Sequence, residues 1–202
     1  MRNFRKVCLA LICTLVLSGC REAPPQAHHA DAALPSDSVY NLESRWIDQS
    51  GKELELRSLR GKPQVMAMIY GRCEGACPRI IEELRQVEKS ITEKSPDGAG
   101  FVLVTMDPEV DTPERLQTLA KEYRLSDRWT LIRGSEEQTR ELAALLGVKY
   151  RKISDTDYAH SNTISVLSSA GVVAHQKQNL GGVETSTRAL EEAIAHKDPC
   201  CE

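Results

Sequence analysis

Two cysteines carry the clearest chemical signal in this 202-residue chain. Cys73 and Cys77 lie in the segment Tyr70–Pro78 (YGRCEGACP), which follows an apolar run and precedes a helical pattern. Thiolates are nucleophiles and soft metal ligands, and a helix N-terminus with Arg72 and Arg79 nearby is expected to lower the pKa values of both thiols. The sequence therefore predicts thiol or metal chemistry in this loop.

The residues alone allow three interpretations of the Cys73–Cys77 pair. A permanent structural disulfide is the least favoured, because a bridge across so short a loop gains little stability. A redox pair, forming a disulfide when oxidised, is the second, although its spacing is one residue longer than the usual Cys-x-x-Cys. A soft-metal site is the third, since two thiolates suit Cu(I) and Zn(II), but a structural zinc site would need four closed ligands.

A histidine favours the metal interpretation. His160 lies in Asp157–Asn162, an expected loop just before the apolar strand pattern Thr163–Leu167. In a sheet of the predicted order, that loop would lie beside the cysteine loop. Two thiolates and one imidazole would form a three-coordinate site for Cu(I), and the imidazole would also accept Cu(II). His175, on a predicted strand, is expected to be a surface or packing residue.

Alternating apolar runs and helical spacings predict an α/β domain. Two short segments around a turn predict an N-terminal hairpin, and nearly continuous apolar runs predict buried strands. The order predicts a mixed central sheet with helices on both faces, compatible with a thioredoxin-like domain. The expected strands cover 39–47, 53–56, 64–70, 101–106, 129–132, 163–167 and 172–175, and the expected helices cover 78–94, a segment from 113, 135–146 and 184–196.

Cap residues set the expected helix starts. Pro78 suits the first helical position, which would place Cys77 at or next to the N-cap. Asp111 and Thr112 are candidate N-caps for the next helix. Asp107 and Asp111 need no role beyond a turn and a helix cap at this stage.

Three motifs in this order resemble the SCO/SenC family. They are Cys-x-x-x-Cys-Pro after a buried strand, the acidic segment Asp107–Glu114 (DPEVDTPE), and a histidine before the penultimate strand. The resemblance runs from about Val39 to Ala195, and it implies thioredoxin-like, membrane-anchored proteins that bind copper during assembly of the dinuclear copper centre of cytochrome c oxidase. By this resemblance, Cys73, Cys77 and His160 are the copper ligands.

The chain departs from the family pattern around the first cysteine. Glu74-Gly75 stands where the family commonly has Pro-Asp, and Gly71-Arg72 stands where it often has Thr-x. These changes leave the ligands intact but alter the surface that a partner would touch. They therefore bear on the recipient more than on the metal.

The first 19 residues are predicted to be a lipoprotein signal peptide. Arg2, Arg5 and Lys6 precede the apolar run Val7–Leu17, which is too short to span a bilayer. The sequence Leu-Ser-Gly-Cys then resembles a bacterial lipobox, which makes Cys20 the expected lipidation site; an ordinary secretory cleavage site is the alternative. Acyl chains would hold the exported protein on a bacterial membrane, facing the periplasm or the cell exterior.

The remaining layout follows from composition. Residues 20–38 are an expected flexible tether, 39–196 the thioredoxin-like copper-binding domain, and 197–202 a cysteine-containing tail. His28 and His29 in the tether are interpreted as solvated side chains rather than metal ligands. Cys200 and Cys201 follow His196 and are interpreted as part of a frayed tail whose thiols have no role or pair with another chain; picking up Cu(I), passing it to the main site or exchanging with the main pair is the alternative.

Several functional classes are disfavoured. The net charge of −3 and the nine aromatic residues argue against nucleic-acid binding. No Thr-x-x-Cys arrangement of a peroxidatic site surrounds the cysteines. General thiol oxidoreductases of the thioredoxin fold usually carry a cis-proline opposite their cysteines, and residues 155–163 contain no proline.

The combined interpretation is a metallochaperone and not an enzyme. It would hold Cu(I), or also Cu(II), at Cys73, Cys77 and His160 and deliver it to an apo copper protein or oxidase subunit, and we expect it to be monomeric. The alternative is an enzyme, a thiol–disulfide reductase that keeps a partner's copper-ligand cysteines reduced through Cys73 and Cys77.

Overall fold

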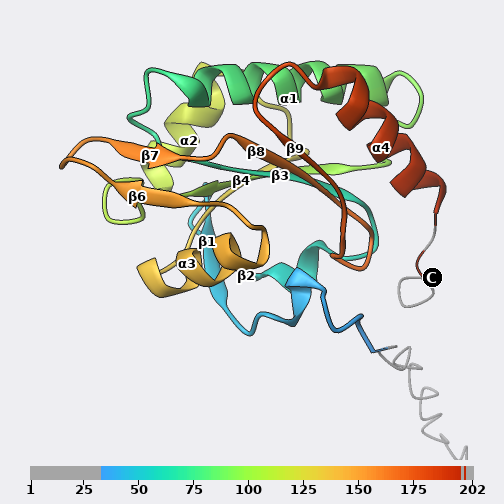
Figure 1. The fold of residues 1–202 in the computed structure, drawn as a ribbon, viewed down its shortest axis with the longest axis horizontal. Helices are drawn as coiled ribbons and strands as arrows, with labels where there is room; N and C mark the ends of the chain where they lie inside the picture. The colour runs from blue at the N-terminus through green and yellow to red at the C-terminus, as the bar shows by residue number, and fades with distance from the viewer. Residues whose placement is uncertain (1–32, 197, 199–202) are drawn as a thin grey trace, which may run out of the picture. The chain divides into compact units, whose positions relative to one another are not determined.

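A seven-stranded sheet forms the centre of the protein (Figure 1). The computed structural model describes residues 33–196 and 198, which belong to one compact unit, Asp31–Glu202. The strand order is β2-β1-β5-β4-β3-β8-β9. The strands are β1 (Arg45–Asp48), β2 (Glu53–Glu55), β3 (Gln64–Ile69), β4 (Gly100–Thr105), β5 (Trp129–Arg133), β8 (Thr163–Leu167) and β9 (Val173–Gln178).

The central strands are those with nearly continuous apolar sequences. Every residue of β3, β4 and β8 is buried, as expected for strands covered on both faces. β3, β4 and β5 run parallel, whereas β1 and β8 are antiparallel to their neighbours. The predicted mixed sheet is thus confirmed, and the cysteine loop follows directly from β3, the neighbour of the middle strand β4.

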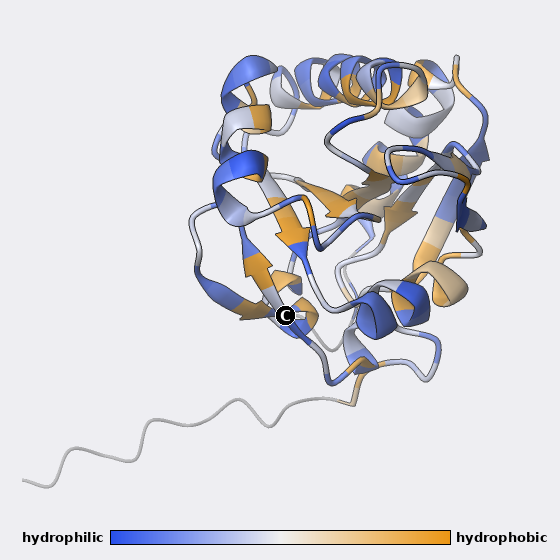
Figure 2. Ribbon diagram, turned by 90° about the vertical axis from the view of Figure 1, so that its left-hand side faces the viewer, coloured by the Kyte–Doolittle hydropathy of each residue, from blue (hydrophilic) through white to orange (hydrophobic). Residues whose placement is uncertain are grey.

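Helices cover both faces of this sheet, as predicted. α1 (Ala76–Thr92) and α4 (Val183–Ala195) pack against each other on one face, and α3 (Glu136–Leu145) lies on the other (Figure 1). α2 (Pro113–Glu122) connects β4 to β5, and the right-handed rule for such crossovers places it on the α1 face. Figure 2 shows hydrophobic residues concentrated in the central strands, with polar residues on the outer helix surfaces. Among the described residues, none of the helices combines the length and apolar character needed to cross a bilayer.

The N-terminal hairpin is shorter than predicted. β1 and β2 pair antiparallel, with Trp46 opposite Leu54, but only the end of the expected first arm forms a strand. Val39–Asn41 is instead a short 3₁₀ helix, because the Ser38 hydroxyl accepts a hydrogen bond from the Tyr40 N–H and caps a tight turn. This turn buries Val39 and Tyr40 in the core.

Helix α1 begins two residues earlier than predicted. Its N-cap is Gly75, so Cys77 is the second residue of the helix and Pro78 the third, and the expectation of Cys77 at or next to the N-cap is wrong. Proline is tolerated there because the N–H groups of a first helical turn have no acceptor within the helix. The predicted cap of α2 is confirmed, since the Thr112 hydroxyl accepts a hydrogen bond from the Arg115 N–H.

A second, two-stranded sheet lies outside the sequence prediction. β6 (Tyr150–Lys152) and β7 (Tyr158–His160) form an antiparallel hairpin in which Tyr150 pairs with His160. The expected loop at Asp157–Asn162 is therefore wrong over its first half. Residues 151–157 are exposed, so the segment lacks the apolar alternation by which a half-buried strand is recognised. This hairpin holds the candidate histidine ligand.

Candidate metal centre

The two cysteines lie where β3 gives way to α1. Cys73 sits in the connecting loop and its N–H donates to the Tyr70 carbonyl at 3.1 Å. Cys77 lies in the first helical turn, and its N–H donates to the Cys73 sulfur at 3.3 Å. Cys73 is partly exposed, whereas Cys77 is buried, and both are free thiols. The loop therefore presents one accessible and one covered sulfur at the same point.

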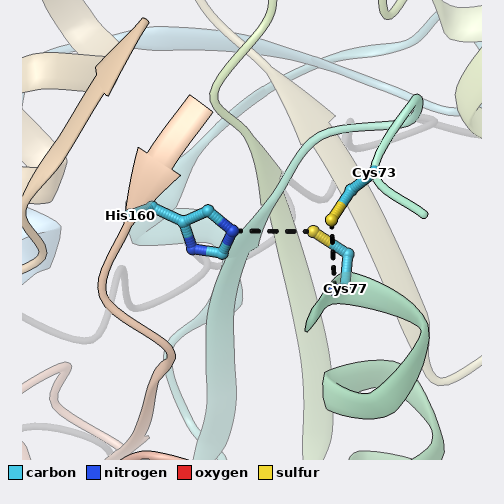
Figure 3. A group of neighbouring side chains, drawn as sticks. All are labelled: Cys73, Cys77 and His160. Carbon is cyan, nitrogen blue, oxygen red and sulfur yellow. Dashed lines mark hydrogen bonds between the residues drawn. The ribbon is translucent and has the colours of Figure 1, made fainter. Parts of the chain in front are cut away.

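His160 completes a group of three soft donors. Its Nε2 lies 3.9 Å from the Cys77 Sγ, and one donor atom from each of Cys73, Cys77 and His160 falls within 4.8 Å of the others (Figure 3). The His160 Nδ1 lies 3.2 Å from the Ser161 carbonyl oxygen. Because a carbonyl oxygen can only accept, Nδ1 carries the proton and the Nε2 lone pair faces the sulfurs. The expected proximity of the two loops is confirmed.

The two thiols have opposite pKa shifts. Burial alone would raise the pKa of the Cys73 thiol, but hydrogen bonds from Cys77 and Tyr70 outweigh it and hold that pKa below its ordinary value. Burial, followed by the hydrogen bond with Cys73, raises the pKa of the Cys77 thiol. The expectation of two lowered pKa values is thus confirmed for Cys73 and wrong for Cys77. A buried thiol next to a sulfur that already takes the negative charge resists ionisation.

Two buried carboxyl groups form hydrogen bonds with the cysteine loop and hold it in place. Asp111 is fully buried, and its Oδ2 accepts hydrogen bonds from the Gly71 N–H at 2.9 Å and from the Thr105 hydroxyl. Asp107 is 2% exposed and accepts from the Arg72 guanidinium at 2.6 Å. Their interpretation as only a turn and a cap is too modest, because both carboxyl groups fix the backbone or side chain of the cysteine loop.

The buried Asp111 carboxyl also explains why residue 71, which departs from the family pattern, is a glycine. A Cβ atom at residue 71 would lie 2.4 Å from the Asp111 Oδ1, well inside van der Waals contact. A side chain there would displace the buried carboxyl or the loop. The Gly71 carbonyl in turn accepts from the Arg115 guanidinium at 3.0 Å, so α2 holds the loop as well.

Polar contacts tie the β6–β7 hairpin to the cysteine loop. The Arg72 guanidinium donates to the Asp155 carbonyl at 2.8 Å, and the Tyr70 hydroxyl donates to the Asp157 carboxylate. The Tyr158 hydroxyl donates to Asp107 at 3.1 Å. These contacts hold the hairpin that carries His160 against the loop that carries the two thiols. Sequence reasoning missed them, since no local pattern connects residues more than 50 positions apart.

Aromatic rings line one side of the centre. The Tyr70 ring meets His160 edge-on, with centroids 5.8 Å apart, and packs against Tyr158 at 5.2 Å. Burial is the main cause that raises the pKa of Tyr158 to about 12, and the Asp107 charge adds to it. Burial, followed by the hydrogen bond with Asp157, raises the pKa of Tyr70 as well, so both phenols stay neutral at physiological pH and act as hydrogen-bond donors. The edge-on ring of Tyr70 limits the rotation of the His160 imidazole.

A cleft of about 1180 Å³ opens onto the three donors. Glu74 and Gly75, which depart from the family pattern, are exposed at its rim. Arg115 and Glu122 of α2 line another side. The altered loop residues thus lie on the surface that an approaching molecule would meet.

The other candidate residues lie elsewhere. Arg79 is exposed on α1, and His175 is partly buried on the edge strand β9, as expected for a packing residue. His196 is exposed beyond α4. Other predicted features fall outside the described residues, namely Cys20, His28, His29, Cys200 and Cys201.

The donor set fits a soft metal ion. Two sulfurs and one imidazole nitrogen form the group, and no fourth histidine, cysteine or carboxylate joins it within residues 33–196 and 198. Thiolate ligands select Cu(I), whereas a structural zinc site would close with four protein ligands. The residues present are therefore suited to copper.

Comparisons with known proteins place the chain in a family. A sequence model described as SCO1/SenC matches residues 36–195. A protein of Stutzerimonas stutzeri, named as a proposed copper-binding protein, is 26% identical over 174 residues, which cover 81% of this chain and 80% of that protein. The SCO1 protein homolog of Bacillus subtilis is 30% identical over 103 residues, covering 50% of this chain and 53% of that protein.

Solved structures share the fold. The SCO1/SenC family lipoprotein from Bacillus anthracis has a TM-score of 0.70 at 22% identity, covering 81% of this chain and 100% of that chain. Arabidopsis thaliana ScoI with copper bound has a TM-score of 0.68 at 23% identity, covering 75% of this chain and 96% of that chain. These likenesses confirm the thioredoxin-like α/β fold. Since the family match extends over most of the sequence, this chain belongs to the SCO1/SenC family.

Proposed function

We propose that the protein is an extracytoplasmic copper carrier that holds Cu(I) at Cys73, Cys77 and His160. One observation carries this proposal: three soft donor atoms from two separate segments lie within 4.8 Å of one another, with the His160 Nε2 on the side of the sulfurs. The copper-binding names of the relatives support it. The imidazole would also accept Cu(II), because it is a harder ligand than a thiolate.

The geometry suggests how bound copper would leave. A Cu(I) ion can pass from one set of ligands to another without any covalent bond of the protein being broken. Cys73 is the partly exposed donor and Cys77 the buried one, so an incoming thiolate or imidazole would replace Cys73 first. Arg72 and the tyrosines would keep His160 in place during this exchange.

The proposed recipient is an apo copper protein, such as the oxidase subunit that carries the dinuclear copper site of cytochrome c oxidase. The family membership supports an oxidase-related recipient. The exposed Glu74-Gly75 at the rim of the cleft would contact it, and we expect the carrier to act as a monomer.

We also infer how the chain is placed outside the cytoplasm. Residues 1–19 would act as the signal peptide, lipidated Cys20 as the anchor on a bacterial membrane, and 20–38 as a tether. The domain 39–196 and the tail 197–202 would then face the periplasm or the cell exterior. The B. anthracis neighbour is named a lipoprotein, which supports this arrangement.

An anaerobic Cu(I) titration against a competing chelator tests the carrier. The protein would be the compact unit 31–202 with Cys200→Ser and Cys201→Ser, so that only the main site can bind. We expect one tightly bound Cu(I), lost in Cys73→Ser/Cys77→Ser and weakened about 10- to 100-fold in His160→Ala. His175→Ala is the matched histidine control and should bind as the parent does. Binding that is indifferent to His160 would refute the proposed ligand set.

A thiol–disulfide reductase is the second candidate, and the opposite pKa shifts of the two cysteines favour it. The Cys73 thiolate would attack a partner's disulfide, form a mixed disulfide and release one partner thiolate. Cys77 would then lose its proton and attack the Cys73 sulfur, which closes the Cys73–Cys77 disulfide and releases the second thiolate. Two electrons pass to the partner, and a dithiol reductant must restore the pair. This reaction should survive His160→Ala, whereas copper binding should not.

A further inference from the structure

One carboxylate contacts both segments that carry the candidate ligands. The Asp107 Oδ2 accepts a hydrogen bond from the Arg72 guanidinium at 2.6 Å, and its Oδ1 accepts one from the Tyr158 hydroxyl at 3.1 Å. Arg72 directly precedes Cys73, and Tyr158 lies two residues before His160. Asp107 itself follows β4 and belongs to neither segment. Each carboxylate oxygen therefore holds one of the two segments that bring the donor atoms together.

The Asp107 carboxylate is a fixed point for these two contacts. Its side chain is only 3% exposed, and its backbone N–H donates to the Thr105 hydroxyl at 3.0 Å. Thr105 is fully buried at the end of β4, the middle strand of the central sheet. A buried carboxylate cannot turn away from its donors without leaving its own charge uncompensated. Asp107 therefore ties the hairpin and the cysteine loop to the sheet as well as to each other.

The β6–β7 hairpin depends on such contacts for its position. Its strands have three residues each, and a two-stranded hairpin is at best marginally stable by itself in water. Among the described residues, the hydrogen bonds between residues 153–159 and the chain outside the hairpin go to Tyr70, Arg72 and Asp107. Two of these three partners involve the Asp107 carboxylate, because the Arg72 nitrogen that donates to it also donates to the Asp155 carbonyl at 2.8 Å.

The thiols have supports of their own. Cys77 belongs to α1, and the Asp111 carboxyl accepts from the Gly71 N–H in the cysteine loop. His160, by contrast, is carried by β7 of the hairpin, with its Nε2 3.9 Å from the Cys77 sulfur. A change at Asp107 is therefore expected to displace the imidazole and to leave the two sulfurs in place.

We propose that Asp107 is a positioning residue that keeps the His160 imidazole within reach of the two thiols. Its effect on copper rests on the proposed carrier function, whereas its effect on the position of the hairpin does not. With the carboxylate in place, copper would meet two sulfurs and one nitrogen. Without the carboxylate, the centre would offer only the two thiolates, which still suit Cu(I) but lack the third ligand.

Hydrogen exchange in the metal-free, reduced protein tests the position of the hairpin. The protein is again the unit 31–202 with Cys200→Ser and Cys201→Ser. Asp107→Asn removes the charge at nearly constant volume. In this variant we expect the amides of residues 150–160 to exchange at least about tenfold faster, with the exchange of α1 and β3 unchanged. Glu109→Gln is the matched control, because Glu109 is an exposed acid in the same loop.

A double-mutant cycle on Cu(I) affinity tests whether Asp107 acts through the imidazole. We expect Asp107→Asn to weaken Cu(I) binding about 10- to 100-fold, as His160→Ala does. The combined variant should then bind Cu(I) within about twofold of His160→Ala alone, because the imidazole is already lost. A role confined to the cysteine loop would instead multiply the two losses.

Tyr158→Phe separates the hydrogen bond from the charge. It keeps the Arg72–Asp107 ion pair and removes only the bond from the hairpin, so its changes should be smaller but of the same kind. It also carries the test should Asp107→Asn fail to fold. Unchanged hairpin exchange in these variants, or losses of Cu(I) affinity that multiply with that of His160→Ala, would overturn the proposal. If His160→Ala itself leaves Cu(I) affinity unchanged, the proposed ligand set fails, and hairpin exchange alone decides whether Asp107 holds the hairpin.

Discussion

The Cys73 and Cys77 thiols are four residues apart but occupy different electrostatic environments. Hydrogen bonds to Cys73 lower the pKa of its thiol despite partial burial, whereas burial raises the pKa of the Cys77 thiol. Since the thiolate is the reactive form, we expect iodoacetamide at neutral pH to modify Cys73 at least about tenfold faster than Cys77 in the metal-free reduced protein. Mass spectrometry of the two labelled sites over time measures both rates.

The same labelling gives its own control. In Cys77→Ser, the Cys73 thiol loses the sulfur partner but keeps the N–H donor of residue 77, so its labelling should slow and remain faster than that of Cys77 in Cys73→Ser. Equal labelling rates for both wild-type cysteines would contradict the assignment of Cys73 as the ionised thiol.

Asp111 makes stability depend on pH in an unusual direction for an acid. Burial is the largest influence that raises the pKa of this carboxyl, and the Asp107 charge adds to it, against the hydrogen bonds from Thr105 and Gly71. A pKa higher in the folded than in the unfolded chain means that folding favours the protonated form. The stabilisation by Asp111 is therefore complete below its unfolded pKa and is lost as pH rises through the folded pKa.

Asp111→Asn removes this titration. Between about pH 4 and pH 7, the free energy of unfolding of the variant should improve relative to that of the wild type as pH rises. Urea denaturation at a series of pH values measures the difference, and the exposed Asp127→Asn is the matched aspartate-to-asparagine variant. A constant difference between Asp111→Asn and wild type would show that the carboxyl does not titrate in this range.

At the residue scale, the candidate ligands were predictable, whereas the residues that hold them in place were not. Cys73 and Cys77 stand out because cysteine is rare and the pair follows a buried strand, and His160 gains meaning from the predicted sheet order. Asp107 and Asp111 looked like ordinary turn and cap residues. Their role depends on contacts with Gly71 and Arg72, and such contacts between distant segments leave no periodicity in the sequence.

At the scale of elements, burial decided which predictions succeeded. β3 is buried throughout and was predicted to within one residue of each end. The hairpin of β6 and β7 was missed, because its polar residues face solvent and its strands have only three residues each. The start of α1 was misplaced by two residues, since Pro78 suits any position of a first turn.

One buried carboxylate joins two helices. Glu83 of α1 is 6% exposed and accepts hydrogen bonds from the N–H groups of Gly181 and Gly182 at 2.7 and 2.8 Å, just before α4 begins. Glu83→Ala leaves both donors without their acceptor and should lower the free energy of unfolding by about 1 to 3 kcal/mol. Urea denaturation measures the loss.

The neighbouring Glu82 supplies the matched comparison. It is exposed, and its contacts are with Arg85 and Gln86 of the same helix. Glu82→Ala should therefore change the free energy of unfolding by no more than about 0.5 kcal/mol. Similar losses in the two alanine variants would mean that Glu83 contributes only through helix α1 and not through the junction with α4.

For the whole molecule, topology decides what the cysteine loop can meet. β3 is antiparallel to β8, so the loop after β3 and the hairpin before β8 emerge at the same end of the sheet. This juxtaposition followed from the predicted element order, although the hairpin itself did not. At the other end of the sheet, the Asp198 carboxylate accepts hydrogen bonds from the Ser169 hydroxyl and the Ala170 N–H, contacts that the sequence did not predict.

The same topology disfavours general disulfide exchange. The segment before β8 lies near the cysteines, but every peptide bond among the described residues is trans, and the His160 imidazole lies 3.9 Å from the Cys77 sulfur. A cis-proline at this place would offer main-chain groups to an extended substrate, whereas here the His160 imidazole stands beside the Cys77 sulfur. We therefore expect reduction of insulin by dithiothreitol to proceed no faster with this protein than with its Cys73→Ser/Cys77→Ser variant, as followed by turbidity. His160→Ala removes the imidazole from this approach and is the informative companion variant. A gain of insulin reduction in that variant alone would show that the imidazole keeps extended substrates away from the cysteines. Rapid reduction by the wild type would show that the cysteine pair accepts extended substrates despite the imidazole.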